Sequence, residues 1–186
     1  MTSDATSTRD DLLDRVGDIF YARGSYLVGM AEVVKHLRTT RATFYRYFDS
    51  KEALVVAYLG QRDVQVRENL AKITAGRIGE DPVLAVFANL EEKTQAESFR
   101  GCAFLLAAIE NPHSQDIQQA ARNHKILLKD FFRNLVGGED RLAEQLLLLY
   151  EGALAGSVLR REAAAATTAK SIAAKLLSDR RSLPEG

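Results

Sequence analysis

A helical period in the apolar residues runs through almost the whole chain and limits its fold more than any other feature. Apolar side chains recur three or four residues apart in one segment after another, as they do on one face of an amphipathic helix. Strand signals are missing, because no segment sustains a two-residue alternation and no Asn-Gly or Asp-Gly pair marks a hairpin. The sequence therefore predicts an all-α chain of about nine helices.

Glycine, proline and capping residues divide this pattern into separate helices. Thr8 and Asp11 have capping-box spacing at the start of the first helix, which should end at Gly24. Asp49 and Glu52 have the same spacing before the fourth helix. The expected helices cover about residues 8–23, 30–36, 41–47, 50–75, 81–94, 102–110, 114–135, 139–161 and 163–177. The stripe expected to be buried on the long helix 114–135 is Ile117, Ala121, His124, Leu128, Phe131 and Leu135.

The composition excludes several classes of protein. The 186 residues are 46% hydrophobic, which is enough to bury a core and argues against global disorder. A single cysteine excludes an intramolecular disulfide framework, and the three histidines lack the spacing of metal ligands. We find no nucleophile–base pair, paired carboxylates or glycine-rich phosphate loop. We therefore expect no enzyme, no cofactor and no metal site.

The sequence shows neither a membrane span nor a secretory signal. No apolar run reaches the roughly 18 residues that a span needs. The richest stretch, residues 142–159, is interrupted by Glu144, Gln145 and Glu151. The N-terminal segment is polar and acidic and lacks the apolar centre of a secretory signal. We expect a soluble cytoplasmic protein without a membrane partner.

The basic residues gather in one part of the chain although the net charge is zero, with 25 basic and 25 acidic side chains. Residues 1–34 carry three basic and six acidic side chains. Between Lys35 and Lys51 there are five basic side chains and one acidic one, Asp49. Local clustering matters more for nucleic-acid binding than the total charge. On charge alone, a solvated helix face is the simpler interpretation.

Residues 30–54 combine this charge with the pattern of two short helices joined by a turn near residues 37–40. Phe44 and Phe48 lie one helical turn apart and should face inward. The outward faces then carry Arg41, Thr43, Tyr45, Arg46 and Tyr47. A short helix of this composition can enter a major groove and contact both bases and phosphates. Lys51, in the first turn of the next helix, is unfavourable for the helix dipole, and a phosphate contact would explain it.

The run Thr40-Arg41-Ala42-Thr43-Phe44-Tyr45-Arg46-Tyr47-Phe48, followed by Ser50-Lys51-Glu52 and Leu54, resembles the helix-turn-helix signature of the TetR family of transcriptional regulators. The helix that precedes this run, residues 30–36, and Gly24 in the loop before that helix also fit, so the close match covers residues 8–60. Segments 100–112 and 145–153 are similar to parts of the ligand-binding and dimerisation domain in one branch of that family. The resemblance implies a helix-turn-helix DNA-binding domain in residues 1–52 and a helical ligand-binding and dimerisation domain in residues 53–186.

The resemblance also assigns DNA contacts residue by residue. Arg41, Ala42, Thr43 and Arg46 match family positions that face the bases. Thr40, Tyr45, Tyr47 and Lys51 match positions that usually contact phosphates. Packing beneath the domain is a second interpretation of Tyr47. Two residues depart from the family pattern, because Arg38 and Ala42 stand where glycine is common. A left-handed backbone at Arg38 would be strained or rearranged.

In this family the C-terminal helices enclose an apolar cavity, which needs only a few polar anchors. The residues that the resemblance suggests for a ligand site are Phe87, Phe104, Asn111, His124, Leu128, Phe131 and Tyr150. An ordinary core would have the same composition, and a histidine satisfied by its neighbours is the simpler interpretation of His124. Cys102 is interpreted as a small core residue in preference to a redox switch.

The penultimate helix is apolar almost all round, and the last helix is rich in alanine on one side. Gly152 and Gly156, one turn apart, would permit close helix approach. Both features predict an isologous four-helix interface between two copies of the chain. The expected interface residues are Leu148, Gly152, Gly156, Leu159, Ala169, Ile172 and Ala173.

These features together predict a homodimeric, ligand-responsive repressor. It would bind a palindromic operator in double-stranded DNA and be released by a small-molecule inducer. The alternative is a DNA-architectural or scaffolding protein that uses the same DNA-binding module without an inducer.

Overall fold

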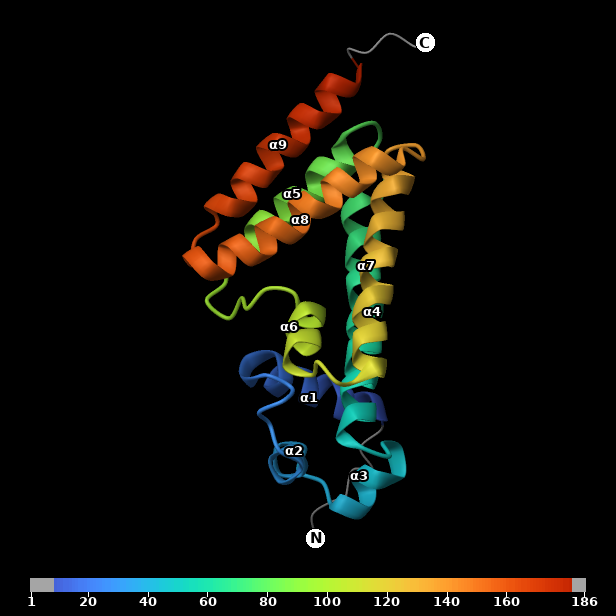
Figure 1. The fold of residues 1–186 in the computed structure, drawn as a ribbon, viewed down its shortest axis with the longest axis vertical. Coiled ribbons are helices and arrows are strands. Elements are labelled where there is room, and N and C mark those ends of the chain that lie inside the picture. Colours follow the sequence, from blue (N-terminus) through green and yellow to red (C-terminus); the bar gives the residue numbers. More distant parts are fainter. Residues whose placement is uncertain (1–8, 182–186) are drawn as a thin grey trace. The chain divides into compact units, whose positions relative to one another are not determined.

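The computed structural model describes residues 9–181, and this range folds into nine α-helices without a strand (Figure 1). The all-α prediction is confirmed. The helices are α1 (Arg9–Arg23), α2 (Met30–His36), α3 (Arg41–Tyr47), α4 (Lys51–Thr74), α5 (Asp81–Lys93), α6 (Ala103–Glu110), α7 (Gln115–Leu135), α8 (Asp140–Arg160) and α9 (Ala164–Arg181).

The helices begin and end near the expected glycine and capping residues, with a different capping residue at α4. Gly24 follows α1 with a left-handed φ of 91°, which glycine adopts at little cost. The cap of α4 is Ser50 and not Asp49, because Ser50 Oγ accepts a hydrogen bond from the Ala53 N–H at 3.0 Å. The capping residue expected for α1, Thr8, lies outside the described residues.

The chain forms two compact units. The first comprises residues up to Val64 together with Ala103–Arg122, and the second comprises Gln65–Cys102 together with the residues from Asn123 onward. The long helices α4 and α7 therefore each contribute to both units. The linear division expected at residue 52 does not coincide with this partition, because α6 and the start of α7 pack with the N-terminal helices.

The first unit has a core built from α1 and the helices that follow it. The buried residues that share this core are Leu12, Leu13, Val16, Phe20, Val33, Leu37, Phe44, Phe48, Leu54 and Tyr58. Two reciprocal hydrogen bonds join α1 to the end of α2, since Arg15 Nη2 donates to His36 O at 2.8 Å and His36 Nε2 lies 3.0 Å from Arg15 O. This shared core and the two hydrogen bonds fix the positions of α2 and α3 relative to α1.

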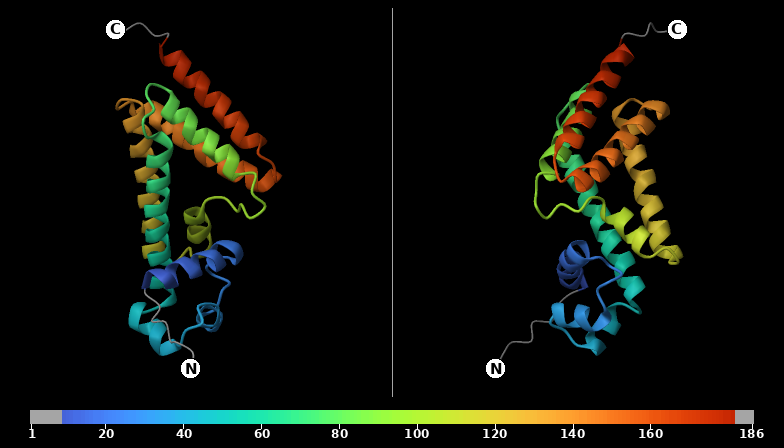
Figure 2. Two further views of the ribbon diagram at one scale, coloured as in Figure 1. Left: turned by 180° about the vertical axis from the view of Figure 1, so that it is seen from behind. Right: turned by 60° about the vertical axis from the view of Figure 1, so that its left-hand side comes forward.

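In the second unit, α9 packs along both α5 and α8 (Figure 2). Phe87, Phe132 and Tyr150 meet in an aromatic cluster with ring centroids 6.0–6.2 Å apart. Phe132 and Val136 are buried, whereas Phe131 and Leu135 are only partly buried. The expected stripe on α7 is therefore wrong over its last two positions. Apolar residues occupy both 131 and 132, and packing against Phe87 selects Phe132.

Helix α8 covers the apolar stretch that the sequence showed to be interrupted by charged residues. Its length and composition would allow it to cross a membrane, and it is the helix in residues 9–181 that meets that test. In the structure it is a core helix, with Leu142, Ala143, Leu146 and Leu147 buried. Burial in the protein accounts for the apolar side chains on this face of α8, whereas Leu148 and Leu159 are exposed.

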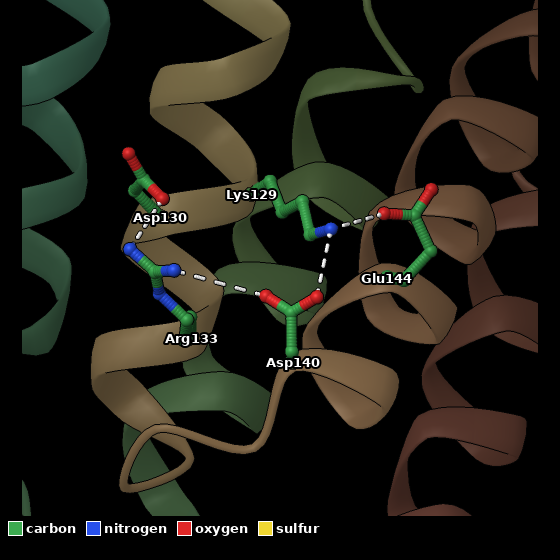
Figure 3. A network of polar contacts seen from close by, with 5 residues as sticks. All are labelled: Lys129, Asp130, Arg133, Asp140 and Glu144. Atoms are coloured by element: carbon green, nitrogen blue, oxygen red, sulfur yellow. Dashed lines mark hydrogen bonds and ion pairs between the residues drawn. The ribbon is translucent and has the colours of Figure 1, made fainter.

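The α7–α8 connection is fastened by exposed ion pairs (Figure 3). Lys129 Nζ lies 3.0 Å from Glu144 Oε2 and 3.1 Å from Asp140 Oδ2, and both carboxylates raise the pKa of Lys129 above its ordinary 10.5. Arg133 pairs with Asp130 at 2.8 Å and lies 3.8 Å from Asp140. Because these groups are solvated, the pairs orient the turn more than they stabilise the fold.

Candidate nucleic-acid interface

The turn between α2 and α3 keeps the left-handed geometry that glycine usually provides. Arg38 has a φ of 49°, and it follows Leu37, which is fully buried. The Thr39 N–H donates to Val34 O at 3.2 Å, which closes the end of α2. Arg38 therefore occupies a left-handed backbone position in this turn, at the cost of a strained residue.

Helix α3 begins with a side-chain cap. Thr40 has extended backbone geometry, and its Oγ1 accepts a hydrogen bond from the Thr43 N–H at 3.1 Å. The Thr43 hydroxyl lies 3.0 Å from the same oxygen. The cap satisfies one of the N–H groups that the start of a helix leaves unpaired. It orients the end of α3 that carries Arg41.

Two phenylalanines anchor α3 to the first unit. Phe44 and Phe48 are buried, with ring centroids 5.5 Å apart, as the spacing predicted. The residues left exposed on α3 are Arg41, Ala42, Tyr45 and Arg46. Half of the Tyr45 side chain reaches solvent although it is apolar in large part. A rigid helix with two cations and a phenol outward has the chemistry that DNA recognition requires.

Tyr47 is half-buried and lies beneath Arg46. The Arg46 guanidinium stands 5.0 Å from the centre of the Tyr47 ring, and its Nη2 donates to the Tyr47 hydroxyl at 3.2 Å. Stacking of this kind restricts the arginine side chain. Tyr47 therefore supports Arg46 within α3.

Lys51 makes a contact that the sequence pattern did not indicate. Its Nζ donates to Tyr26 O at 2.8 Å and lies 5.9 Å from the centre of the Tyr26 ring. Partial burial lowers the pKa of Lys51 from its ordinary value of 10.5, and the negative charge of Glu110 opposes that shift. Tyr26 lies in the loop between α1 and α2, far from Lys51 in the sequence, so no local motif reveals this pair.

The residues expected to bind a ligand are distributed over both units. In the second unit, Phe87 and Leu128 are buried in the core, His124 is also buried, and Tyr150 joins the aromatic cluster. Burial raises the pKa of Tyr150 to about 12, with a smaller contribution from Cys102. Phe131 lines a groove of about 530 Å³ between α4 and α7.

The other two expected ligand residues, Phe104 and Asn111, belong to the first unit. Phe104 is buried, and Asn111 Nδ2 donates to both Ser25 Oγ and Ala107 O at 2.9 Å. Asn111 thus has a structural role at the end of α6. Its part in a ligand site stays a prediction.

The residues expected at a dimer interface divide into two groups. Leu148, Gly152, Leu159 and Ile172 are exposed. Ala169 and Ala173 are buried inside the second unit at 4% and 0% exposure, so their side chains are withdrawn from the surface. Gly156 also acts within one copy, because a Cβ there would lie 2.9 Å from Ala165 Cβ on α9. The burial of Ala169 and Ala173 corrects their expected place between two copies, whereas the place of Gly156 at that interface stays a prediction.

Residues 12–58 match the sequence profile of the bacterial regulatory proteins of the tetR family. Over 65 residues the chain is 42% identical to two uncharacterized HTH-type transcriptional regulators from strains of Mycobacterium tuberculosis. The matched segment covers 34% of this chain and spans about a third, 32%, of the length of these curated relatives.

The similarity to solved structures extends over most of the chain. A TetR-family transcriptional regulator from Streptomyces coelicolor has a TM-score of 0.85 and 29% identity, covering 92% of this chain and 94% of its own. A TetR-family regulator from Cytophaga hutchinsonii has a TM-score of 0.81, covering 96% of this chain and 98% of its own, and at 17% identity it supports the fold alone. Both of these structures are of transcriptional regulators of the TetR family. With the capped α3 and its buried phenylalanines, residues 12–58 match the DNA-binding domain of the TetR family of transcriptional regulators, and the chain as a whole shares the fold of TetR-family structures.

Proposed function

We propose that this regulator is a cytoplasmic, homodimeric repressor that binds a palindromic operator and is released by a small-molecule inducer. The observation that carries the proposal is the exposed face of α3, where Arg41, Tyr45 and Arg46 project from a helix anchored by buried phenylalanines. The seven residues of α3 span about 10 Å at 1.5 Å each, a length that fits within a major groove.

Each side chain on this surface has a contact suited to its chemistry. Arg41 and Arg46 carry planar guanidinium groups that bind guanine edges in pairs of hydrogen bonds, and Ala42 and Thr43 would lie against the neighbouring bases. Thr40, Tyr45, Tyr47 and Lys51 offer hydroxyl or ammonium donors to phosphates. Phosphate contacts would set the position of α3, and the arginines would read the sequence.

An exposed apolar strip on α8 supports dimerisation. Leu148, Gly152, Ala155 and Leu159 follow helical spacing on one face, and each is exposed. Leu159 is 85% exposed, and Ile172 on α9 adds a further exposed apolar side chain. Exposed apolar side chains that share one helix face are typical of interaction surfaces. An isologous contact would place two copies of α3 about a two-fold axis, which requires a palindromic operator.

Release by an inducer requires the ligand to favour a state that fits DNA poorly. The groove lined by Phe131, Leu127 and Ile126 has a volume of about 530 Å³, which lies in the range of small-molecule sites. Typical coupling energies between two such sites are about 1–3 kcal/mol. An inducer that shifts the population by this amount lowers operator occupancy several-fold or more.

The test is selection of bound sequences from random double-stranded DNA at one salt concentration. A base-reading dimer enriches a palindrome whose half-sites lie about one helical turn, ~34–36 Å, apart or at a related spacing. The enriched duplex then becomes the probe for release by candidate small molecules. Enrichment of no sequence contradicts the proposal. A palindrome whose binding no metabolite alters would instead favour the architectural alternative.

A further inference from the structure

We propose that Glu110 is a positioning residue for DNA binding, because its carboxylate holds the loop that in turn holds Lys51. The inference rests on the phosphate contact proposed above for Lys51. All the residues involved belong to the first unit. Neither the helix-turn-helix signature nor the basic cluster includes Glu110, which lies at the end of α6.

The carboxylate of Glu110 binds two consecutive residues of the α1–α2 loop. Its Oε2 accepts a hydrogen bond from Ser25 Oγ at 2.9 Å and another from the Tyr26 N–H at 3.2 Å. Ser25 is 3% exposed, so the bond to its hydroxyl lies in a protected environment. Asn111 Nδ2 donates to the same Ser25 oxygen at 2.9 Å and completes the arrangement.

The absence of a side chain at Gly24 leaves room for the Glu110 carboxylate against the loop. A Cβ at this position would lie 2.6 Å from Glu110 Oε1, and the φ of 91° disfavours any other residue as well. The backbone turn that ends α1 therefore also opens the space that the carboxylate occupies. Glu110 and the loop fit each other closely in shape as well as in hydrogen bonding.

Through Tyr26, the loop that Glu110 holds also fixes the position of the Lys51 ammonium. While the Tyr26 N–H is held by Glu110, the Tyr26 carbonyl accepts from Lys51 Nζ at 2.8 Å. The ammonium has three N–H donors, so one bond to Tyr26 still leaves donors for a phosphate oxygen. The negative charge of Glu110 also acts on Lys51 directly and raises the pKa of its ammonium against the effect of burial. The carboxylate thus sets the location of the cation through Tyr26.

The sign of the effect separates positioning from simple charge. Removal of a carboxylate near DNA should strengthen binding if its only role is repulsion of phosphates. Positioning predicts the opposite for Glu110→Ala, because Tyr26 and then Lys51 lose their fixed places. Glu110→Gln keeps an amide oxygen that can accept from both Ser25 and Tyr26, so this variant should restore most of the affinity.

The experiment measures duplex binding over a series of salt concentrations for the full chain and its variants. Glu110→Ala should bind about three- to tenfold more weakly, and the slope of log K against log[salt] should fall by about 0.9 for each phosphate that the protein no longer neutralises. A smaller folded fraction would lower the affinity equally at every salt concentration and leave that slope unchanged. Asp116→Ala is the matched control, because it removes an exposed carboxylate from the same unit.

Two further measurements decide the outcome. In a double-mutant cycle, Glu110→Ala combined with Lys51→Ala should bind no more weakly than Lys51→Ala alone. Without DNA, hydrogen exchange at the Tyr26 amide should be faster in Glu110→Ala than in the wild type. Wild-type affinity and slope in Glu110→Ala, additive losses in the cycle, or unchanged exchange at Tyr26 would each overturn the inference. If the wild type binds no duplex at all, the proposed function fails and this inference fails with it.

Discussion

The hydroxyl oxygen of Thr40 accepts a hydrogen bond from the Thr43 N–H at 3.1 Å, and this bond starts the helix that carries the exposed arginines. Both residues were expected to contact DNA. The structure shows that Thr40 also has a role within the protein, since its oxygen caps α3. The single Thr40 O–H proton is donated to Thr43 Oγ1 at 3.0 Å, so a phosphate contact requires the hydroxyl to turn away from Thr43 while its oxygen keeps capping the helix.

Loss of this cap should destabilise the first unit. Thr40→Ala removes the acceptor and should lower the free energy of unfolding by about 0.5–2 kcal/mol. Thr40→Ser keeps the oxygen and should cost far less. Urea denaturation followed by circular dichroism measures both values. Equal stability of the alanine and serine variants would contradict the capping role.

The protein should be more stable with glycine at position 38 than with a residue that has a Cβ. At a φ of 49° the backbone of Arg38 is left-handed, so Arg38→Gly removes the clash of its Cβ, whereas Arg38→Ala keeps a Cβ on the same backbone. Both variants remove the same charge. The glycine variant should therefore exceed the alanine variant by about 0.5–1 kcal/mol in the free energy of unfolding. Thermal unfolding of the pair checks this, and a more stable alanine variant would refute it.

Arg46 should contribute to sequence preference. Arg46→Ala should cost about 1–3 kcal/mol on the preferred duplex and much less on random duplex, because a side chain that reads a base favours only the sequence that contains this base. Arg122→Ala removes an exposed arginine from α7 in the same unit and serves as the control. Competition binding with specific and random duplexes measures the ratio. An equal loss on both duplexes would assign Arg46 to phosphate contact.

Leu159 should be essential to the dimer and unimportant to the folded monomer. Leu159→Lys places a charge on the exposed strip of α8, where burial of each leucine would contribute about 1.5–3 kcal/mol, twice over in a two-fold interface. Sedimentation velocity should show dissociation at micromolar concentration. Ile78→Lys is a close control, since Ile78 is 83% exposed and Leu159 is 85% exposed. If the two variants sediment alike, α8 is not the interface.

Tyr150 should make stability fall at high pH. Its folded-state pKa of about 12 exceeds its ordinary value of 10.0, so the folded protein holds the phenol proton more tightly than the unfolded chain. The stabilisation is complete below pH 10 and is lost as the pH rises from about 10 to 12, by about 1–3 kcal/mol in total. Urea denaturation at pH 8 and pH 11 measures the difference between the wild type and Tyr150→Phe. A Tyr150→Phe variant with the same pH dependence as the wild type would exclude this residue as the cause.

Local sequence rules predicted most of the fold. The bounds of α2 and α3 match the expected ranges, because a turn, a cap and two inward phenylalanines define a helix-turn-helix within about 25 residues. The outward position of Arg41, Tyr45 and Arg46 follows from the same helical period. These features depend on residues close together in the chain, which a sequence pattern can describe.

Tertiary packing decided the features that join distant residues. The sequence by itself determined the all-α class, the bounds of α3 and the apolar character of α8. Only the structure turned Ala173 inward, placed Gly156 against Ala165, and brought the Glu110 carboxylate to Ser25, 85 residues away. The physical reason is that a helical period specifies which residues share a face but not which partner covers that face. That partner is chosen by the packing of the whole unit.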